Sequence, residues 1–231
     1  MKDKVVVITG GMGNLGRAVA RAFALAGSRI AVIDHHPVSD AEAAKAGDRF
    51  LPVGQIDLTQ FAHAERAMQT IIAKLGRIDV LVNIAGGFRW QTLADGDLAG
   101  WDQMYDINLK TAVTACKAAL PGILQSDAGR IINIGAAAAA KAAAGMGAYA
   151  ASKSGVLRLT ESLSEEVKDR GVTVNAILPG TIDTPQNRQS MPKADASRWV
   201  APEAIAAVVV FLASDSAQAI TGAAIPVFGR G

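Results

Sequence analysis

One pair of side chains in the sequence has the residue types and the spacing for proton transfer. Tyr149 and Lys153 are four residues apart in the stretch GAYAASK, so on a helix they lie on the same face. A free phenol has a pKa of about 10 and is a poor proton donor or acceptor at neutral pH. A neighbouring ammonium group favours the phenolate and lowers that pKa. This pair is therefore our candidate acid–base centre.

A glycine-rich turn near the start of the chain has the pattern of a phosphate-binding loop. The stretch TGGMGNLG at 9–16 follows a β-branched run and matches G-x-G-x-x-G. Such glycines permit a tight turn and close approach of the backbone to a pyrophosphate, and the next helix points its N-terminus at the phosphates. A purely structural glycine turn is the alternative. The residues expected to line a dinucleotide here are Gly10, Gly11, Met12, Gly13, Asn14, Leu15 and Gly16.

An acidic side chain after the second predicted strand favours NAD(H) as the dinucleotide. Asp34 lies 18 residues after Gly16, where a carboxylate can accept hydrogen bonds from both ribose hydroxyls and repels a 2′-phosphate. No arginine follows it, whereas His35 and His36 do. We therefore expect NAD(H), with NADP(H) as the alternative. The two histidines could instead bind a metal ion, but the sequence shows no third ligand nearby, so we expect no metal site.

Two later segments fit the same cofactor crevice. Asp57 and Leu58 follow the third predicted strand, where the aspartate could meet the adenine amine or could simply start a helix. The stretch LVNIAGG at 81–87 ends the fourth strand in small residues that let the chain pass close to a dinucleotide. The cofactor candidates in this stretch are Asn83, Ala85 and Gly86.

The elements that must position these residues are short apolar strands alternating with alanine-rich helices. Several strands are apolar throughout, as expected for parallel strands covered on both faces. We expect strands at 4–9, 29–34, 49–53, 78–82, 129–134, 172–178 and 223–228. We expect helices at roughly 14–26, 39–46, 59–75, 98–124, 147–170 and 202–213. Regular alternation over residues 1–231 predicts one α/β domain with a doubly wound, parallel, seven-stranded Rossmann-type sheet.

Composition excludes several classes of function. Half of the 231 residues are hydrophobic, and 23 Lys and Arg nearly balance 21 Asp and Glu, which argues against a nucleic-acid or anionic-membrane surface. The longest apolar run, at 204–213, is about half the length that spans a bilayer. The one cysteine, Cys116, is expected to be a buried thiol. With no targeting segment evident at the N-terminus, we expect a cytoplasmic protein that acts on a small molecule.

The order of the motifs resembles that of the short-chain dehydrogenases/reductases over essentially the full chain. The matching stretches are TGGMGNLG, Asp57, NIAG at 83–86, Asn108 in WDQMYDINL, YAASK, NAILPGTIDT at 175–184 and ITGAAIPVFG near the end. The resemblance implies that Tyr149 exchanges the proton, while Lys153 holds the nicotinamide ribose and tunes the tyrosine. It implies that Asn108 supports a water in the proton relay. The cofactor contacts that it implies after the sixth strand are Pro179, Gly180, Ile182 and Thr184.

The same resemblance implies an assembly. Members of this family form homodimers or homotetramers, in which helices corresponding to 98–124 and 147–170 pair across a two-fold axis. The alanine-rich faces of both helices permit such close packing. We therefore expect a homo-oligomer, either a dimer or a tetramer.

One departure from the family pattern bears on the substrate. Ala136 stands where the commonest form has a serine that hydrogen-bonds the substrate carbonyl, and no hydroxyl occurs from 135 to 148. Loss of such a donor typically costs a factor of about a hundred to a thousand in rate. A conjugated imine in a quinonoid heterocycle needs chiefly a proton, because its ring spreads the charge. Two smaller departures are Ile84, in place of a second asparagine, and Asn14, in place of the usual middle glycine.

The dihydropteridine reductases are the short-chain members that lack this serine while keeping the tyrosine and the lysine. The stretches TPQNRQSMPKADASRW at 184–199, AGGF at 85–88 and GMGAY at 145–149 resemble that group. Asn108 and ITGAAIPV look more like the ordinary bacterial reductases. We expect NADH-dependent reduction of a quinonoid dihydropteridine or a similar heterocycle. The alternatives are an ordinary carbonyl or alcohol substrate, such as a 3-oxoacyl compound or a small ketone, and a non-catalytic NAD(H)-binding protein.

Two loops are candidates for contact with the substrate. The segment at about 181–199 lacks periodicity, which is typical of a mobile substrate loop, and Arg188 in it could anchor an anionic substrate. Trp199 could belong to the same lid. The aromatic residues after the fourth strand could stack on a flat ring or could merely fill the crevice. The substrate candidates are Gly87, Phe88, Trp90, Ala136, Asn187 and Met191.

Overall fold

A single parallel sheet carries the fold. The computed structural model describes residues 1–37 and 49–230. Its seven strands lie in the order β3-β2-β1-β4-β5-β6-β7, and every neighbouring pair is parallel. The strands are β1 (Val5–Thr9), β2 (Arg29–Ile33), β3 (Phe50–Val53), β4 (Val80–Asn83), β5 (Arg130–Ile134), β6 (Thr173–Pro179) and β7 (Ala224–Val227). The doubly wound, Rossmann-type single domain predicted from the sequence is confirmed.

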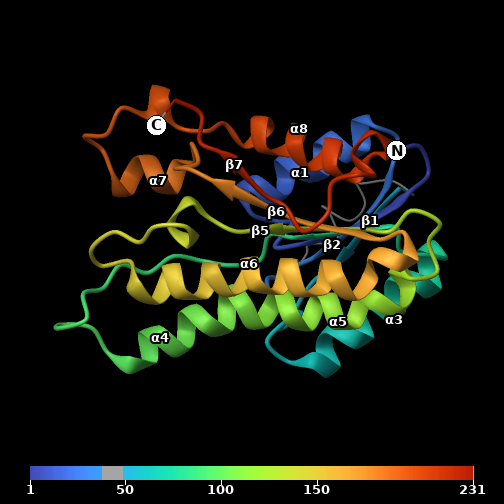
Figure 1. Ribbon diagram of the computed structural model, residues 1–231, viewed down its shortest axis with the longest axis horizontal. Helices are drawn as coiled ribbons and strands as arrows, with labels where there is room; N and C mark the ends of the chain where they lie inside the picture. Colours follow the sequence, from blue (N-terminus) through green and yellow to red (C-terminus); the bar gives the residue numbers. More distant parts are fainter. Residues whose placement is uncertain (38–48, 231) are drawn as a thin grey trace.

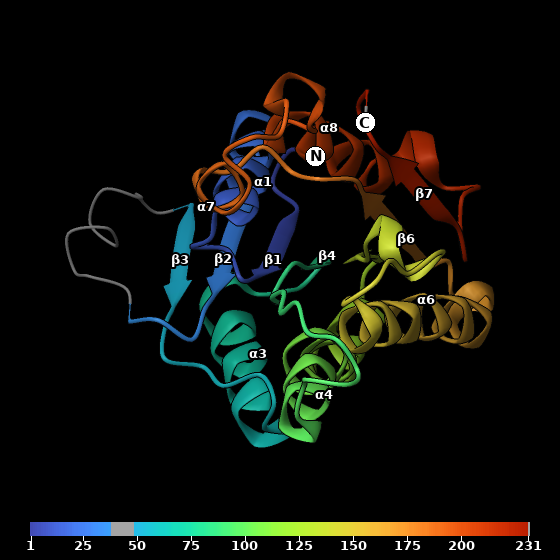
Figure 2. The same ribbon diagram turned by 90° about the vertical axis from the view of Figure 1, so that its left-hand side faces the viewer.

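Helices cover both faces of the sheet, which explains why its strands are apolar throughout. On one face α1 (Asn14–Leu25) packs against α8 (Pro202–Ala213), and α3 (Phe61–Leu75), α5 (Thr111–Ile123) and α6 (Gly147–Val167) cover the other (Figures 1 and 2). Each face of the sheet has its own hydrophobic core, and alternate residues of β1 point into one core or the other. Val5 and Val7 belong to the core under α3 and α5, whereas Val6 and Ile8 pack toward α1 and α8.

Two of the predicted elements differ in the structure, and a third cannot be compared. The helix expected at 98–124 is divided into α4 (Leu98–Met104), a π-helical segment (Tyr105–Lys110) and α5. The segment at 181–199 is partly helical, with α7 (Pro185–Ser190) and a 3₁₀ turn (Ala196–Arg198). The helix expected at 39–46 lies outside the described residues. The remaining 3₁₀ turns are Ala137–Ala139, Lys168–Arg170 and Asp215–Ala217.

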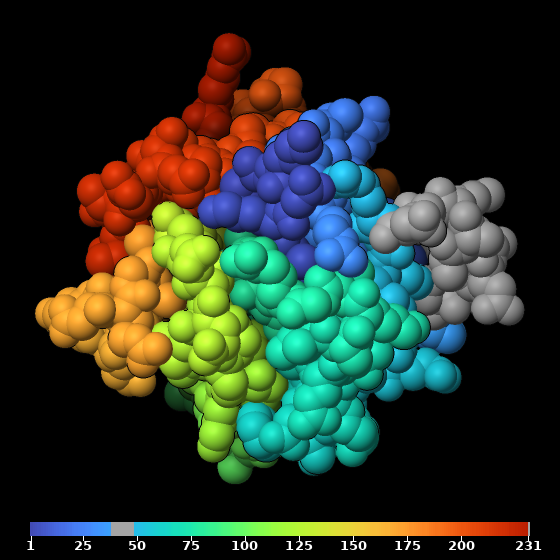
Figure 3. Space-filling model, turned by 90° about the vertical axis from the view of Figure 1, so that its right-hand side faces the viewer, coloured from blue at the N-terminus to red at the C-terminus, as the bar shows by residue number. Residues whose placement is uncertain are grey.

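The topology brings the candidate residues to one end of the molecule. The strand order reverses direction between β1 and β4, and ligands of such sheets bind at the carboxyl ends of the strands beside that switch point. The loops after β4 and β5 and helix α7 gather at this end, which lies on the left in Figure 1 and faces the viewer in Figure 2. Figure 3 shows the opposite end, where the start of the chain meets the ends of α3 and α5. Among the described helices, none is long and apolar enough to cross a membrane.

Candidate active site

The glycine turn after β1 lies tightly against the loop after β4. Gly10 has a φ of +63°, and a Cβ added there would lie only 2.8 Å from the backbone nitrogen of Ala85. A Cβ on Gly16 would overlap the backbone of Gly10 and Gly11. Gly13 caps α1 without a side-chain hydrogen bond, so the helix keeps backbone N–H groups for a phosphate. These contacts fit a dinucleotide-binding turn at the switch point of the sheet.

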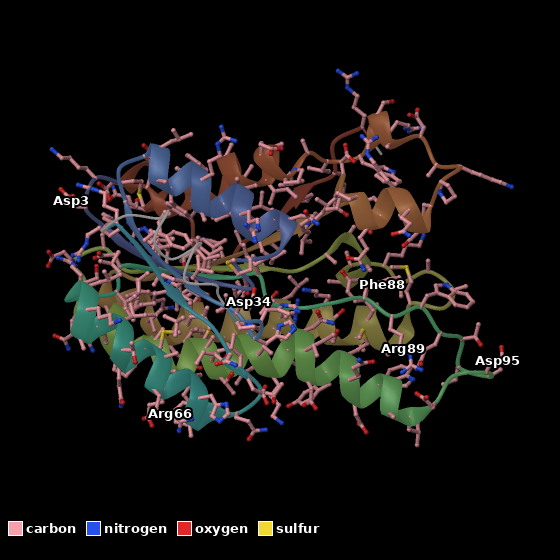
Figure 4. The ribbon with its side chains drawn as sticks, turned by 180° about the vertical axis from the view of Figure 1, so that it is seen from behind. Asp3, Asp34, Arg66, Phe88, Arg89 and Asp95 are labelled. Carbon is pink, nitrogen blue, oxygen red and sulfur yellow. The ribbon has the colours of Figure 1, made fainter. Side chains whose placement is uncertain are left out.

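Asp34 follows β2 beside this turn and is fixed by it (Figure 4). Its carboxylate accepts hydrogen bonds from the backbone nitrogens of Met12 at 3.1 Å and His36 at 3.2 Å. Burial by itself raises the pKa of Asp34, but the hydrogen bonds from His36 and Met12 outweigh it and hold the pKa below its ordinary value. The turn is therefore bordered by the ionised carboxylate of Asp34, which is held in place and can accept hydrogen bonds from ribose hydroxyls.

The structure corrects our reasoning about the two histidines. The Nδ1 atoms of His35 and His36 lie 3.3 Å and 3.1 Å from Oδ1 of Asp34. One ligand atom from each of these three residues lies within 4.8 Å of the others. The third potential metal ligand is Asp34, which directly precedes the two histidines in the chain. It was missed because the carboxylate had already been given a role toward the ribose.

Asp57 begins the turn that leads into α3. Its Oδ1 accepts hydrogen bonds from the backbone nitrogen and the hydroxyl of Thr59, at 2.9 Å and 2.7 Å. These hydrogen bonds, led by the one from the Thr59 side chain, lower the pKa of Asp57. This is the helix-starting role that we had kept as the alternative. Its contact with adenine stays a prediction, as does that of Leu58, whose side chain is buried.

Asn83 ends β4 with its side chain turned into the core. The amide donates to Oδ1 of Asn133 at 2.9 Å and to Sγ of Cys116 at 3.2 Å. Only the backbone of Asn83 can therefore face a dinucleotide. Cys116 is buried as expected, and burial raises the pKa of its thiol to about 12.

Thr9 is a positioning residue that the sequence analysis missed. Its Oγ1 accepts hydrogen bonds from the backbone nitrogens of Ile84 and Ala85, at 3.1 Å and 3.2 Å. The end of β1 thereby fixes the loop after β4, which carries Gly86 and Gly87. A polar residue that closes an otherwise apolar strand was the signal available in the sequence.

Helix α6 places Tyr149 and Lys153 one turn apart, as predicted. Lys153 is buried, and its Nζ donates to the carbonyl of Ile134, at the end of β5, at 2.9 Å. Burial lowers the pKa of Lys153 to about 8 and raises the pKa of Tyr149 to about 12. Desolvation causes the second shift, because it disfavours the phenolate. A phenol with this pKa is protonated at neutral pH and can donate a proton.

Asn108 connects the loop after β4 to α6. It lies in the π-helical segment, a local distortion that is frequent at functional sites. Its Oδ1 accepts from the backbone nitrogen of Gly87 at 3.0 Å, and its Nδ2 donates to the Gly87 carbonyl at 3.1 Å and to Oγ of Ser152 at 3.2 Å. Ser152 in turn donates to the carbonyl of Tyr149 at 2.7 Å. Ser152 was missed, although it is the only polar side chain between Tyr149 and Lys153.

Gly86 brings the loop after β4 against the candidate acid–base residues. A Cβ added to Gly86 would lie 2.5 Å from Oδ1 of Asn108 and 3.4 Å from Nζ of Lys153. The structure thus gathers Gly86, Asn108, Tyr149 and Lys153 at one place, as the motifs predicted. The water relay through Asn108 stays a prediction.

An exposed aromatic side chain lies directly against the phenol. The ring centroid of Phe88 is 5.0 Å from that of Tyr149, edge to face at 87°, and 56% of Phe88 is exposed (Figure 4). Trp90 is held differently, since its Nε1 donates to the carbonyl of Ala144 at 3.1 Å. That bond ties the loop after β4 to the alanine-rich loop after β5. Ala136 starts this second loop and is buried.

The segment after β6 satisfies most of its own polar groups. Beyond Pro179 and Gly180, the side chain of Thr184 caps α7 by accepting from the backbone nitrogen of Asn187 at 3.1 Å. The amide of Asn187 donates to the carbonyl of Ile182 at 2.8 Å. The guanidinium of Arg188 binds both carboxylate oxygens of Asp183, at 2.6 Å and 2.8 Å.

These bonds engage two of our lid candidates within their own segment. Asn187 and Arg188 bond to Ile182 and Asp183, each five residues earlier in the chain, and their contact with a substrate stays a prediction. Met191, just after α7, is exposed, whereas Trp199 is half-buried. Met191 therefore remains a lid candidate, because its side chain is exposed.

Known proteins resemble this chain over nearly its whole length. The sequence pattern of the short chain dehydrogenase family matches residues 4–195. The D-threitol dehydrogenase of Mycolicibacterium smegmatis is 36% identical and covers 99% of this chain and 93% of its own. The 3-oxoacyl-[acyl-carrier-protein] reductase of Vibrio harveyi is 34% identical, covering 99% and 97%.

The solved structures agree with the sequence relatives. The aldohexose dehydrogenase of Thermoplasma acidophilum superposes with a TM-score of 0.88 at 28% identity, covering 99% of this chain and 93% of its own. None of the relatives named here is described as a dihydropteridine reductase, so that finer resemblance is not shown. The glycine turn, the paired Tyr149 and Lys153 and these matches together lead to one conclusion: the chain belongs to the short chain dehydrogenase family and is an oxidoreductase of that family.

Proposed function

We propose that the protein transfers a hydride between NAD(H) and a small organic substrate. Tyr149 would donate the proton when the substrate is reduced and accept it when the substrate is oxidised. The observation that carries the proposal is the half-buried phenol of Tyr149, whose pKa of about 12 keeps it protonated, one helical turn from the buried Lys153. When bound, the nicotinamide supplies or accepts the hydride. The glycine turn would hold the pyrophosphate, and Asp34 would receive the ribose hydroxyls and repel a 2′-phosphate.

Each residue of the site has a separate task in this proposal. Lys153 would hold the nicotinamide ribose while its ammonium stays bonded to the Ile134 carbonyl. Asn108 fixes the loop after β4 through Gly87, so that the backbone of Gly86 borders the site. Tyr149 would then donate its proton to the atom of the substrate that gains negative charge.

For the substrate, we propose a conjugated heterocycle such as a quinonoid dihydropteridine. Ala136 offers no hydroxyl to grip a carbonyl oxygen, whereas a conjugated imine needs chiefly the proton of Tyr149. The exposed ring of Phe88, 5.0 Å from the phenol, gives a flat substrate an apolar surface next to the acid. A second candidate, an ordinary carbonyl or alcohol, is favoured by the relatives, which are named for D-threitol and 3-oxoacyl substrates.

The experiment compares the two candidates on one preparation. NADH oxidation is measured with quinonoid dihydropterin, with a panel of ketones and with 3-oxoacyl thioesters, in wild type, Tyr149→Phe and Ala136→Ser. We expect Tyr149→Phe to lose activity of every kind, and Ala136→Ser to improve carbonyl substrates while leaving the heterocycle nearly unchanged. Turnover of ketones alone would remove the heterocycle proposal. Cofactor binding without turnover would instead support a non-catalytic NAD(H)-binding protein.

We also propose that the protein is a cytoplasmic homodimer or homotetramer that pairs through α4, α5 and α6. Exposed aromatic residues gather on this face: Trp101 and Tyr105 border a hollow whose far side is formed by Ala148 and Ala151 of α6. Light scattering after size exclusion should give a dimer or tetramer for wild type and a smaller species for Tyr105→Glu. A monomeric wild type would contradict the proposal.

A further inference from the structure

We propose that Asp34, His35 and His36 form a binding site for a divalent transition-metal ion of the Zn²⁺ type, and that this ion excludes the cofactor. The metal site itself follows from the positions of three side chains. Only its competition with the cofactor rests on the function proposed above, which places the ribose on Asp34.

The spacing of the three ligand atoms fits one small cation. Zinc–nitrogen and zinc–oxygen bonds are about 2.0–2.2 Å long, so neighbouring ligand atoms around a tetrahedral or octahedral ion lie about 2.9–3.4 Å apart. The Nδ1 atoms of His35 and His36 lie 3.3 Å and 3.1 Å from Oδ1 of Asp34. Both distances fall within that interval, and all three ligand atoms lie within 4.8 Å of one another. A small movement of the two exposed imidazole rings would therefore let an ion bind all three atoms.

The surroundings make Asp34 a prepared ligand and leave the ion accessible. The Asp34 side chain is 5% exposed and is fixed by the backbone nitrogens of Met12 and His36, which act as outer-shell donors to a metal ligand. The side chains of His35 and His36 are 74% and 70% exposed. Their open side leaves the remaining coordination positions to water.

The donor set selects the kind of metal. Two imidazole nitrogens and one carboxylate oxygen suit Zn²⁺, Co²⁺, Ni²⁺ and Fe²⁺, whereas Mg²⁺ and Ca²⁺ prefer oxygen ligands. The two rings already lie together, with centroids 3.8 Å apart. The site should therefore bind Zn²⁺ or Co²⁺ and not respond to Mg²⁺.

A metal ion and the ribose would need the same carboxylate. Its Oδ2 accepts a hydrogen bond from the backbone nitrogen of Met12 in the glycine turn, and its Oδ1 lies within hydrogen-bond distance of the imidazole of His36. An ion on Oδ1 neutralises the acceptor that the ribose hydroxyls need, and its water ligands fill the space that they would occupy. Bound metal should thus raise the apparent KM for NADH, by about twofold when the free metal equals its own Kd, and leave kcat unchanged.

The test uses untagged full-length protein that has been freed of metal with a chelator. Binding of ZnCl₂ is measured by calorimetry and binding of Co²⁺ by its visible absorption spectrum, in wild type and in the double variant His35→Gln/His36→Gln. The chain contains three histidines, so His63→Gln, in α3, is the matched control. We expect one ion per chain for wild type and control, and binding weaker by about tenfold or more in the double variant. Absence of Zn²⁺ binding, or equal binding by the double variant, would overturn the metal site.

Competition is tested separately from function. NADH binding to metal-free protein is followed by nicotinamide fluorescence and then repeated with saturating Zn²⁺. We expect Zn²⁺ to weaken NADH binding to wild type and to the His63→Gln control but not to the double variant. If Zn²⁺ and NADH bind together without effect on one another, the exclusion is refuted. If metal-free protein binds no NADH, the proposed function fails while the calorimetry still decides the metal site.

Discussion

Replacing Lys153 by methionine should make the protein more stable while it abolishes turnover. Burial lowers the pKa of Lys153 from 10.5 to about 8, so the folded protein carries an ammonium in an environment that disfavours its charge. At about 1.4 kcal/mol per pH unit, this shift costs about 3 kcal/mol of stability at neutral pH. Methionine has a similar length and no charge, and it packs well in irregular spaces.

The expected gain is smaller than this cost because one hydrogen bond is lost. The bond from Nζ to the Ile134 carbonyl has a charged donor and is worth about 1.5 kcal/mol. The net gain at neutral pH is therefore about 2 kcal/mol. For a chain of this size that corresponds to a rise in Tm of about 4–8 °C.

The dependence on pH gives the prediction a distinctive sign. The folded pKa of Lys153 lies below its unfolded value, so the penalty is fully present below about pH 8 and disappears as the pH rises through the unfolded value. The advantage of the variant should therefore fall by about 2 kcal/mol between about pH 7 and pH 9.5. Tyr149 titrates in both proteins, so its contribution cancels in the difference.

Urea unfolding at these two pH values, followed by tryptophan fluorescence at one protein concentration, measures both quantities. Lys74→Met, on the exposed side of α3, is the matched control and should change stability by less than about 0.5 kcal/mol at either pH. A Lys153→Met protein that is less stable than wild type at neutral pH would refute the reasoning. So would an advantage that does not shrink on the alkaline side.

Three further predictions concern the site itself. Gly86→Ala should lower kcat/KM by about a hundredfold with unchanged circular dichroism, because its Cβ would lie 2.5 Å from the buried amide of Asn108. The control variant Gly122→Ala, in α5, should keep full activity. Asp34→Ala should raise the Kd for NADH about tenfold and that for NADPH less, which nicotinamide fluorescence measures; an equal loss for both cofactors would contradict its proposed role. In the reductive direction kcat/KM should stay level up to about pH 8, since Tyr149 keeps its proton, and should fall above it as Lys153 loses its charge; a profile that rises across that range would be inconsistent with these pKa values.

Some features of this protein could be determined from the sequence because they depend on residues close together in the chain. The continuous apolar strands predicted a sheet covered on both faces, and the G-x-G-x-x-G spacing placed a turn between β1 and α1. The four-residue spacing put Tyr149 and Lys153 on one side of a helix. Periodicity and turn chemistry are local, so these predictions needed no knowledge of distant contacts.

Other features were decided only by the tertiary structure, because they depend on which distant groups meet and how much water they lose. Burial under neighbouring elements, which no spacing in the sequence reveals, raises the pKa of Tyr149. Packing of the π-helical segment against α6 engaged the amide of Asn108 with Gly87 and Ser152. Desolvation and convergence are properties of the assembled molecule, and for that reason only the structure could show them.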